Sequence, residues 1–286
     1  MDWNRMRRST NVEDRRGRSS FGARGTPMRL GLGGLVIALI VGALFGVNPL
    51  YLLSMLQDGG EMPPPQTYTR SPVDGSQADF VRAILGDTED TWKAIFQRSG
   101  KPYEDPKLVL FTGTVQSACG FASAAVGPFY CPRDAEVYLD MGFFQELSQR
   151  FGAPGDFARA YVIAHEVGHH VQNILGIMDT MAAQQTHADH VTRNELSVRQ
   201  ELQADCFAGV WGHYTAQRGL IDHADIESAL NAAAQIGDDR MQKRTQGYVV
   251  PEAFTHGSAA QRQRWFQIGL QSGDPNQCNT FASGQP

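Results

Sequence analysis

The longest apolar segment of this 286-residue chain lies near its start. Residues 30–47 are eighteen residues without a charge or a hydrogen-bonding side chain, and a helix needs about that length to cross a bilayer. We therefore predict a single transmembrane helix over residues 30–56. A cleaved signal peptide is the alternative, but the arm before the segment and the apolar run are both long for one.

The segments on either side of this span suggest an orientation in the membrane. Residues 1–29 contain eight arginines against three acidic residues, and positive charge favours the cytoplasmic side. The sequence thus predicts a single-pass membrane protein whose basic arm is cytoplasmic and whose domain beyond the span is extracytoplasmic, which means periplasmic in a Gram-negative bacterium. Residues 57–76 are rich in glycine and proline and are expected to form a linker to a domain over residues 77–286.

The hydrophobic pattern of the remaining chain mixes two periods. Residues 78–97 have the spacing of an amphipathic helix, whereas residues 108–112 and 136–140 alternate or cluster as strands do. Helical spacing then dominates to the end of the chain. We expect an α+β domain that is mainly helical and has a small sheet. The hydrophobic content of 42% is enough for one sizeable core.

One helical segment carries an H-E-x-x-H motif. Because residues four apart share a helix face, His165 and His169 can converge on one zinc ion with Glu166 beside them. Gly168 lowers helix propensity, so its presence suggests that another segment passes close by. His170 points about 100° around the helix and is expected to have a structural role. The alternative is that the two motif histidines are simply packed in a core.

A catalytic zinc usually has three protein ligands and one open position. Glu201 is the candidate third ligand, because a helical segment carries it together with Asp205 on one face. Asp205 is then expected to accept a hydrogen bond from the free ring N–H of His165, which would fix the tautomer of that ligand.

The expected chemistry is peptide-bond hydrolysis with one Zn²⁺ per chain. Zinc would activate a water molecule, and Glu166 would act as the general base. His256 is the candidate donor to the oxyanion, because it lies just before a helix with a Ser258-x-x-Gln261 capping box. A surface or capping role for His256 is the alternative.

The chain has four cysteines, all in the part predicted to lie outside the cytoplasm, which favours disulfides. Cys119 and Cys131 flank a short loop, so their pairing is the most natural of three connectivities and leaves Cys206 for Cys278. A buried free thiol is the alternative for Cys206.

These motifs together resemble the bacterial family called "putative neutral zinc metallopeptidase", whose site layout is similar to that of gluzincin peptidases. The resemblance spans nearly the whole chain and includes the apolar segment. Its motifs are Asp2 to Asn4 with Arg15 to Gly17, Cys119-Gly120, Gly127 to Pro132, Val137 to Asp140, His165 to Gln172, Glu201 to Cys206 and Phe254 to Arg262.

The resemblance implies a zincin-like peptidase fold. It also suggests that residues 127–140 supply a sheet edge that binds extended substrate, although a purely structural hairpin is equally compatible. Expected partners are a peptide or protein substrate and the membrane, through residues 30–56. Nucleic acid is not expected, because the chain beyond the basic arm is acidic. The second candidate function is a non-catalytic, metal-stabilised envelope module that binds a partner.

Overall fold

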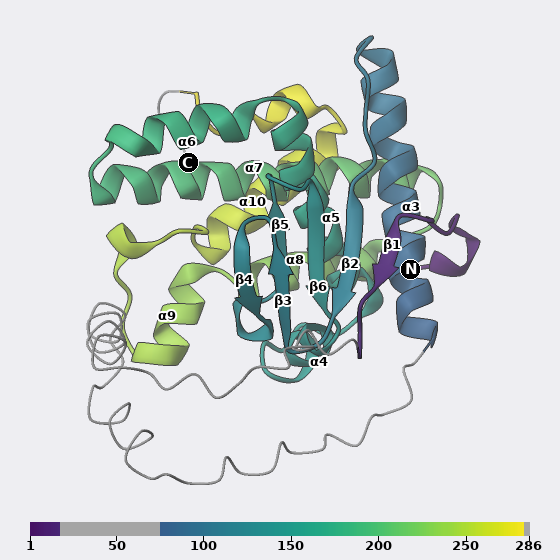
Figure 1. The fold of residues 1–286 in the computed structure, drawn as a ribbon, viewed down its shortest axis with the longest axis horizontal. Helices are drawn as coiled ribbons and strands as arrows, with labels where there is room; N and C mark the ends of the chain where they lie inside the picture. The colour runs from purple at the N-terminus through teal and green to yellow at the C-terminus, as the bar shows by residue number, and fades with distance from the viewer. Residues whose placement is uncertain (18–74, 283–286) are drawn as a thin grey trace, which may run out of the picture. The chain divides into compact units, whose positions relative to one another are not determined.

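The computed structural model describes residues 1–17 and 75–282, which belong to one compact unit (Figure 1). Its α-helices are α3 (Gly75–Arg98), α4 (Gly142–Gln149), α5 (Asp156–Ile174), α6 (Ile177–His187), α7 (His190–Gln217), α8 (His223–Gln235), α9 (Asp238–Gln246) and α10 (Ala259–Ser272). Short 3₁₀ turns are η1 (Trp3–Arg5), η2 (Ala124–Val126), η3 (Pro251–Ala253) and η4 (Pro275–Cys278). The prediction of a mainly helical α+β domain is confirmed.

The main sheet has four strands in the order β1-β2-β6-β5. Strands β1 (Val12–Asp14), β2 (Lys107–Phe111) and β6 (Glu136–Asp140) are parallel, and β5 (Phe129–Cys131) pairs antiparallel with β6 at one edge. Strands β3 (Thr114–Ser117) and β4 (Gly120–Ser123) form a separate antiparallel hairpin. The two predicted strands correspond to β2 and β6. The loop between the paired cysteines adds β4 and most of β5, which the sequence pattern did not reveal.

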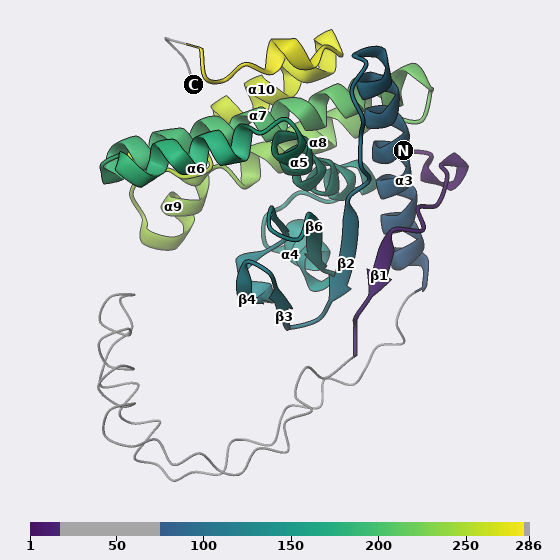
Figure 2. The same cartoon turned by 45° about the horizontal axis from the view of Figure 1, so that its top comes forward.

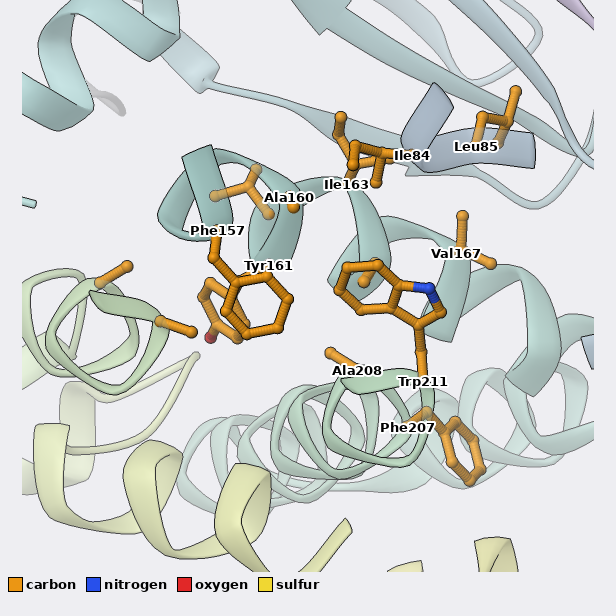
Figure 3. Close-up of a cluster of buried hydrophobic side chains, with 14 of the residues drawn as sticks. Ile84, Leu85, Phe157, Ala160, Tyr161, Ile163, Val167, Phe207, Ala208 and Trp211 are labelled. Carbon is orange, nitrogen blue, oxygen red and sulfur yellow. The ribbon is translucent and has the colours of Figure 1, made fainter. Parts of the chain in front are cut away.

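The helices α5, α7, α8 and α10 form a layer on one side of the sheet (Figure 2). Helix α5 is buried for most of its length. Its apolar side chains pack against those of α3 and α7 (Figure 3). Trp211 of α7 is completely buried and its ring stacks on that of Phe157 of α5. This packing holds the two helices that carry the H-E-x-x-H motif and Glu201.

Glycines allow the helices of this layer to approach closely. A Cβ atom on Gly168 of α5 would lie 2.9 Å from the carbonyl oxygen of Ala204 in α7. A Cβ on Gly209 of α7 would lie 2.1 Å from the Phe266 oxygen, and one on Gly269 of α10 would lie 1.9 Å from the Cys206 oxygen. The prediction that another segment passes close to Gly168 is therefore confirmed, and that segment is α7.

The N-terminal residues belong to the same compact unit as the helices. Strand β1 pairs with β2 in parallel, with Val12 opposite Leu108. The arginines of the arm form ion pairs with acids of α3: Arg7 binds Glu89 at 2.6 Å and Arg8 binds Asp79 at 2.7 Å.

This packing corrects the predicted localisation. A cytoplasmic arm and a catalytic domain on the far side of a membrane could not share a sheet, so the predicted single-pass arrangement is wrong. Two of the arginines that suggested a cytoplasmic arm, Arg7 and Arg8, have their acidic partners in α3.

The fold prediction also needs a correction at its transmembrane helix. Among residues 1–17 and 75–282, no helix is both long enough and apolar enough to cross a membrane, so a transmembrane helix preceding the domain is not supported. The predicted span, residues 30–56, lies outside the described residues. Most of the predicted linker, residues 57–76, lies outside them too, and its last two residues begin α3.

Candidate metal centre

The structure brings His165, His169 and Glu201 together. Helix α5 presents both histidines one turn apart, and α7 presents the glutamate opposite them. A carboxylate oxygen of Glu201 lies 3.1 Å from His165 Nε2, and its other oxygen lies 3.4 Å from His169 Nε2. One donor atom from each of the three residues lies within 4.8 Å of the other two, which makes the group a candidate metal site.

The donor atoms lie close enough together to surround one zinc ion. Ligand atoms about 2.1 Å from a tetrahedral zinc lie about 3.4 Å from one another. The contacts of Glu201 with the two histidines, each through a different carboxylate oxygen, are close to this spacing. Two imidazoles and one carboxylate are also a donor set that zinc favours. These residues therefore fit a zinc ion.

A charged group supports His165 from behind. The Nδ1 atom of His165 lies 2.8 Å from an oxygen of Asp205, and Asp205 is completely buried. Arg262 of α10 binds both oxygens of this carboxylate, at 2.8 and 2.9 Å, and the Tyr161 hydroxyl donates to it as well. Asp205 thus lies where the sequence predicted it, next to His165. Arg262 and Tyr161 were not predicted as parts of this support.

A neutral group supports His169. Its Nδ1 lies 2.8 Å from the side-chain oxygen of Gln172, one turn further along α5. The amide nitrogen of Gln172 donates to the Gln200 carbonyl at 2.7 Å and to the Gln203 side chain at 3.0 Å. Gln203 in turn donates to the carbonyl of Cys278. Since an amide oxygen only accepts, the Nδ1 of His169 carries the proton, and its Nε2 faces Glu201.

The charges at this site favour a cation between the donors. Burial lowers the pKa of His165, but Asp205 and Glu201 outweigh this effect and raise it to about 10. Burial likewise lowers the pKa of His169, and Glu201 raises it above its usual value. Burial raises the pKa of Glu201, but the two imidazoles hold it well below its usual range. Without a metal, protons on the histidines supply the positive charge, which a metal ion would replace.

Glu166 lies beside the three donors and has a different environment. The residue is 7% exposed, and its carboxylate forms no hydrogen bond or ion pair with any residue that the structure describes. Burial raises its pKa. A carboxylate in this setting is free to accept a proton from a molecule in the cleft.

The donors lie in a cleft of about 730 Å³. Gly127 to Tyr130, which lead into and form part of edge strand β5, line one part of it, so the predicted sheet edge is next to the metal site. Apolar side chains line other parts of the cleft and include Phe143, Phe151, Met178 and Met241.

His256 lines the same cleft and keeps about half of its side chain exposed. Its Nδ1 lies 3.3 Å from an oxygen of Asp238, whose other oxygen accepts from the backbone N–H groups of Thr255, His256 and Gly257. The hydrogen bond with Asp238 raises the pKa of His256. The capping box of Ser258 and Gln261 is present, as predicted. Sequence reasoning missed Asp238.

The cysteines form the two predicted disulfides, Cys119–Cys131 and Cys206–Cys278. The first joins the turn between β3 and β4 to the end of β5, and the second joins α7 to η4. His170 points away from the metal donors and makes hydrogen bonds with Tyr130 and with the Glu104 carbonyl, in line with its predicted structural role.

Some of the missed residues left a signal in the sequence. Gln172 and Tyr161 lie three residues after His169 and four before His165, so helix periodicity places them near those ligands. Arg262 and Asp238 belong to other helices, and no local spacing connects them to the motif.

Two helices thus present two histidines and a glutamate, a group that could hold a metal ion, beside a small sheet. The chain belongs to the family described as "Putative neutral zinc metallopeptidase", whose model matches residues 1–281.

Two relatives show how far this similarity extends. The chain is 48% identical over 288 residues to the uncharacterized protein YpfJ of Escherichia coli (strain K12), covering 98% of this chain and 99% of the relative. It is 42% identical over 253 residues to an uncharacterized protein of Mycobacterium tuberculosis (strain H37Rv), covering 84% and 85%. No solved structure matches the chain.

Proposed function

We propose that this protein is a zinc-dependent peptidase in which Glu166 is the general base. The observation that carries the proposal is the position of Glu166. It is buried beside three residues suited to zinc, it lines the cleft, and it has no hydrogen-bond partner among the described residues. A purely structural zinc site has no use for an unpaired carboxylate in that place.

His165, His169 and Glu201 would hold one Zn²⁺. A zinc ion bound there would supply a Lewis acid, which polarises the scissile carbonyl and makes the attacking water easier to deprotonate. Asp205 and Gln172 keep the two imidazoles oriented, with each Nδ1 hydrogen-bonded and each Nε2 turned toward Glu201.

Glu166 would accept the proton of the attacking water and deliver it to the leaving amine. His256 is the proposed donor to the oxyanion, since Asp238 fixes its Nδ1 and its half-exposed ring lines the cleft. The edge strand β5 would hold the peptide in extended form through backbone hydrogen bonds, which require no particular side chain.

Hydrolysis of a mixed peptide library by the zinc-loaded full chain tests this proposal. We expect cleavage by the wild type and a loss of about 10²- to 10⁴-fold in Glu166→Gln, because general acid–base catalysis contributes that much. We expect His256→Ala to lose about 10²-fold in kcat and to keep its zinc.

Glu195→Gln is the matched control, because Glu195 is an exposed glutamate of α7 away from the cleft. It should cleave as the wild type does. No cleavage by zinc-loaded wild type would contradict the proposal and favour the alternative, a metal-stabilised module that binds a partner without hydrolysing it.

A further inference from the structure

Two hydrogen bonds join helix α5 to the edge strand β5, and a third joins it to Pro132, the residue after this strand. The Nδ1 atom of His170 lies 3.1 Å from the Tyr130 hydroxyl. The side-chain amide of Asn173 donates to the same hydroxyl at 2.9 Å and to the Pro132 carbonyl at 3.3 Å. Tyr130 is in the middle of β5, and the two other side chains lie one turn apart on α5. We call these three residues, His170, Asn173 and Tyr130, the strand clamp.

The direction of each bond in the strand clamp follows from one fixed acceptor. The Nε2 atom of His170 lies 2.7 Å from the Glu104 carbonyl oxygen, which can only accept, so Nε2 carries the proton. The unprotonated Nδ1 then accepts from the hydroxyl of Tyr130. That hydroxyl donates to His170 and accepts from Asn173, so its only proton is not available to a substrate.

The strand clamp links the sheet edge to the metal donors through a single helical turn. His169 and His170 are adjacent but point about 100° apart, so one faces the candidate zinc site and the other faces β5. Strand β5 ends the strand order of its sheet, and within the described residues only β6 pairs with it. Tyr130 lines the cleft, whereas His170 does not.

We infer that His170 is a positioning residue, which fixes the edge of β5 relative to Glu166 and so sets where an extended peptide meets the metal site. This inference rests on the proposed peptidase function. It predicts that the strand clamp matters for substrates long enough to pair along β5. Substrates that contact only the atoms around the scissile bond should be insensitive to it.

Steady-state hydrolysis by the full chain tests the inference with two peptides. One is an eight-residue peptide recovered as a substrate from the mixed library, and the other is its four-residue truncation that keeps the scissile bond. The variants are His170→Phe, which keeps an aromatic ring but loses the hydrogen bonds to Tyr130 and Glu104, and Tyr130→Phe, which loses those to His170 and Asn173. Zinc content and circular dichroism verify that each variant is folded.

Tyr103→Phe is the matched control. Its ring contacts that of His170 edge-to-face, at 5.7 Å between centroids, but its buried hydroxyl has no hydrogen-bond partner among the residues that the structure describes. This substitution therefore removes a hydroxyl next to the strand clamp without removing a hydrogen bond. It should leave both peptides unaffected.

For both strand-clamp variants we expect KM for the eight-residue peptide to rise about tenfold, because one to two hydrogen bonds are lost. The value of kcat should stay within about twofold of the wild type. The four-residue peptide should change less than about twofold. The double variant should lose less than the sum of the two single losses, because both changes break the contact between His170 and Tyr130.

Equal losses on the two peptides, additive losses in the double variant, or no loss would overturn the inference while the peptidase function stands. A mixed library from which the zinc-loaded wild type yields no substrate would instead contradict the proposed function, and the inference with it.

Discussion

The two histidines of the candidate zinc site are supported in different ways. Behind His165 lies a charged group, in which Asp205 is bound by Arg262 and Tyr161. Behind His169 lies a neutral group, in which the amide of Gln172 is held by Gln203 and a backbone carbonyl. Both groups fix the orientation of the ring, but only the carboxylate also increases the basicity of its histidine.

The charged support, unlike the neutral one, contains two opposite charges that are buried. Asp205 and Arg262 are 0% and 3% exposed, so each depends on the other for compensation. Arg262 and His165 together hold the pKa of Asp205 at about 2, against the effect of burial. The neutral support has no such dependence. Substitutions in the charged support should therefore lower both the free energy of unfolding and the affinity for zinc. Substitutions in the neutral support should lower mainly the affinity for zinc.

The largest effect is expected for Asp205→Asn. This change keeps the shape of the side chain but leaves Arg262 buried without its anion, which should reduce the free energy of unfolding by about 3 kcal/mol. Zinc affinity should also fall, by about 10- to 100-fold. Thermal unfolding and chelator competition measure the two losses. A variant with unchanged stability would contradict the account of the charged support.

A smaller effect is expected for Gln172→Leu. The His169 ring loses its acceptor, so zinc affinity should fall about tenfold, and stability should fall by about 1 to 2 kcal/mol because buried polar groups lose partners. The same two measurements apply. The comparison fails if Gln172→Leu destabilises the protein more than Asp205→Asn does.

The smallest expected effect is the number of protons that the protein releases when it binds zinc. The pKa of His165 without metal is raised to about 10, so this ring is protonated at neutral pH and must lose its proton to bind zinc. Zinc affinity should therefore rise with pH through the neutral range. Calorimetry at pH 7.5, in buffers that differ in ionisation enthalpy, should show about one proton or more released per zinc.

Asp205→Asn sharpens this measurement, because Asp205 is a main cause of the raised pKa of His165. The variant should release fewer protons than the wild type, whereas Gln172→Leu should release as many. Equal release from wild type and Asp205→Asn would show that the carboxylate does not set the charge of His165.

The arrangement of the candidate site was largely predictable, because its parts lie within single helices. His165, Glu166 and His169 follow from a helical period on one segment, and Glu201 and Asp205 from the same period on another. The amide of Gln172 was equally accessible to that reasoning. Arg262 was not, because 57 residues separate it from Asp205 and only the crossing of α7 and α10 brings them together.

The fold was less predictable where a pattern had two physical explanations. The arginine-rich start was interpreted as a cytoplasmic arm, yet Arg7 and Arg8 bind acids of α3 and the neighbouring β1 joins the sheet. Three-residue strands such as β1 and β5 are too short to show a period. The partner of β1, strand β2, also lies far away in the sequence, whereas β5 pairs with the neighbouring β6.

The most direct test of the central claim is the zinc content of purified variants, measured by plasma mass spectrometry. We predict about one zinc per chain for wild type, Glu166→Gln and the control Glu195→Gln, and almost none for Glu201→Ala, because only Glu201 of these glutamates is placed as a ligand. Equal zinc in Glu201→Ala and wild type would contradict the ligand assignment. Loss of zinc in Glu166→Gln would contradict the division between a ligand and a base.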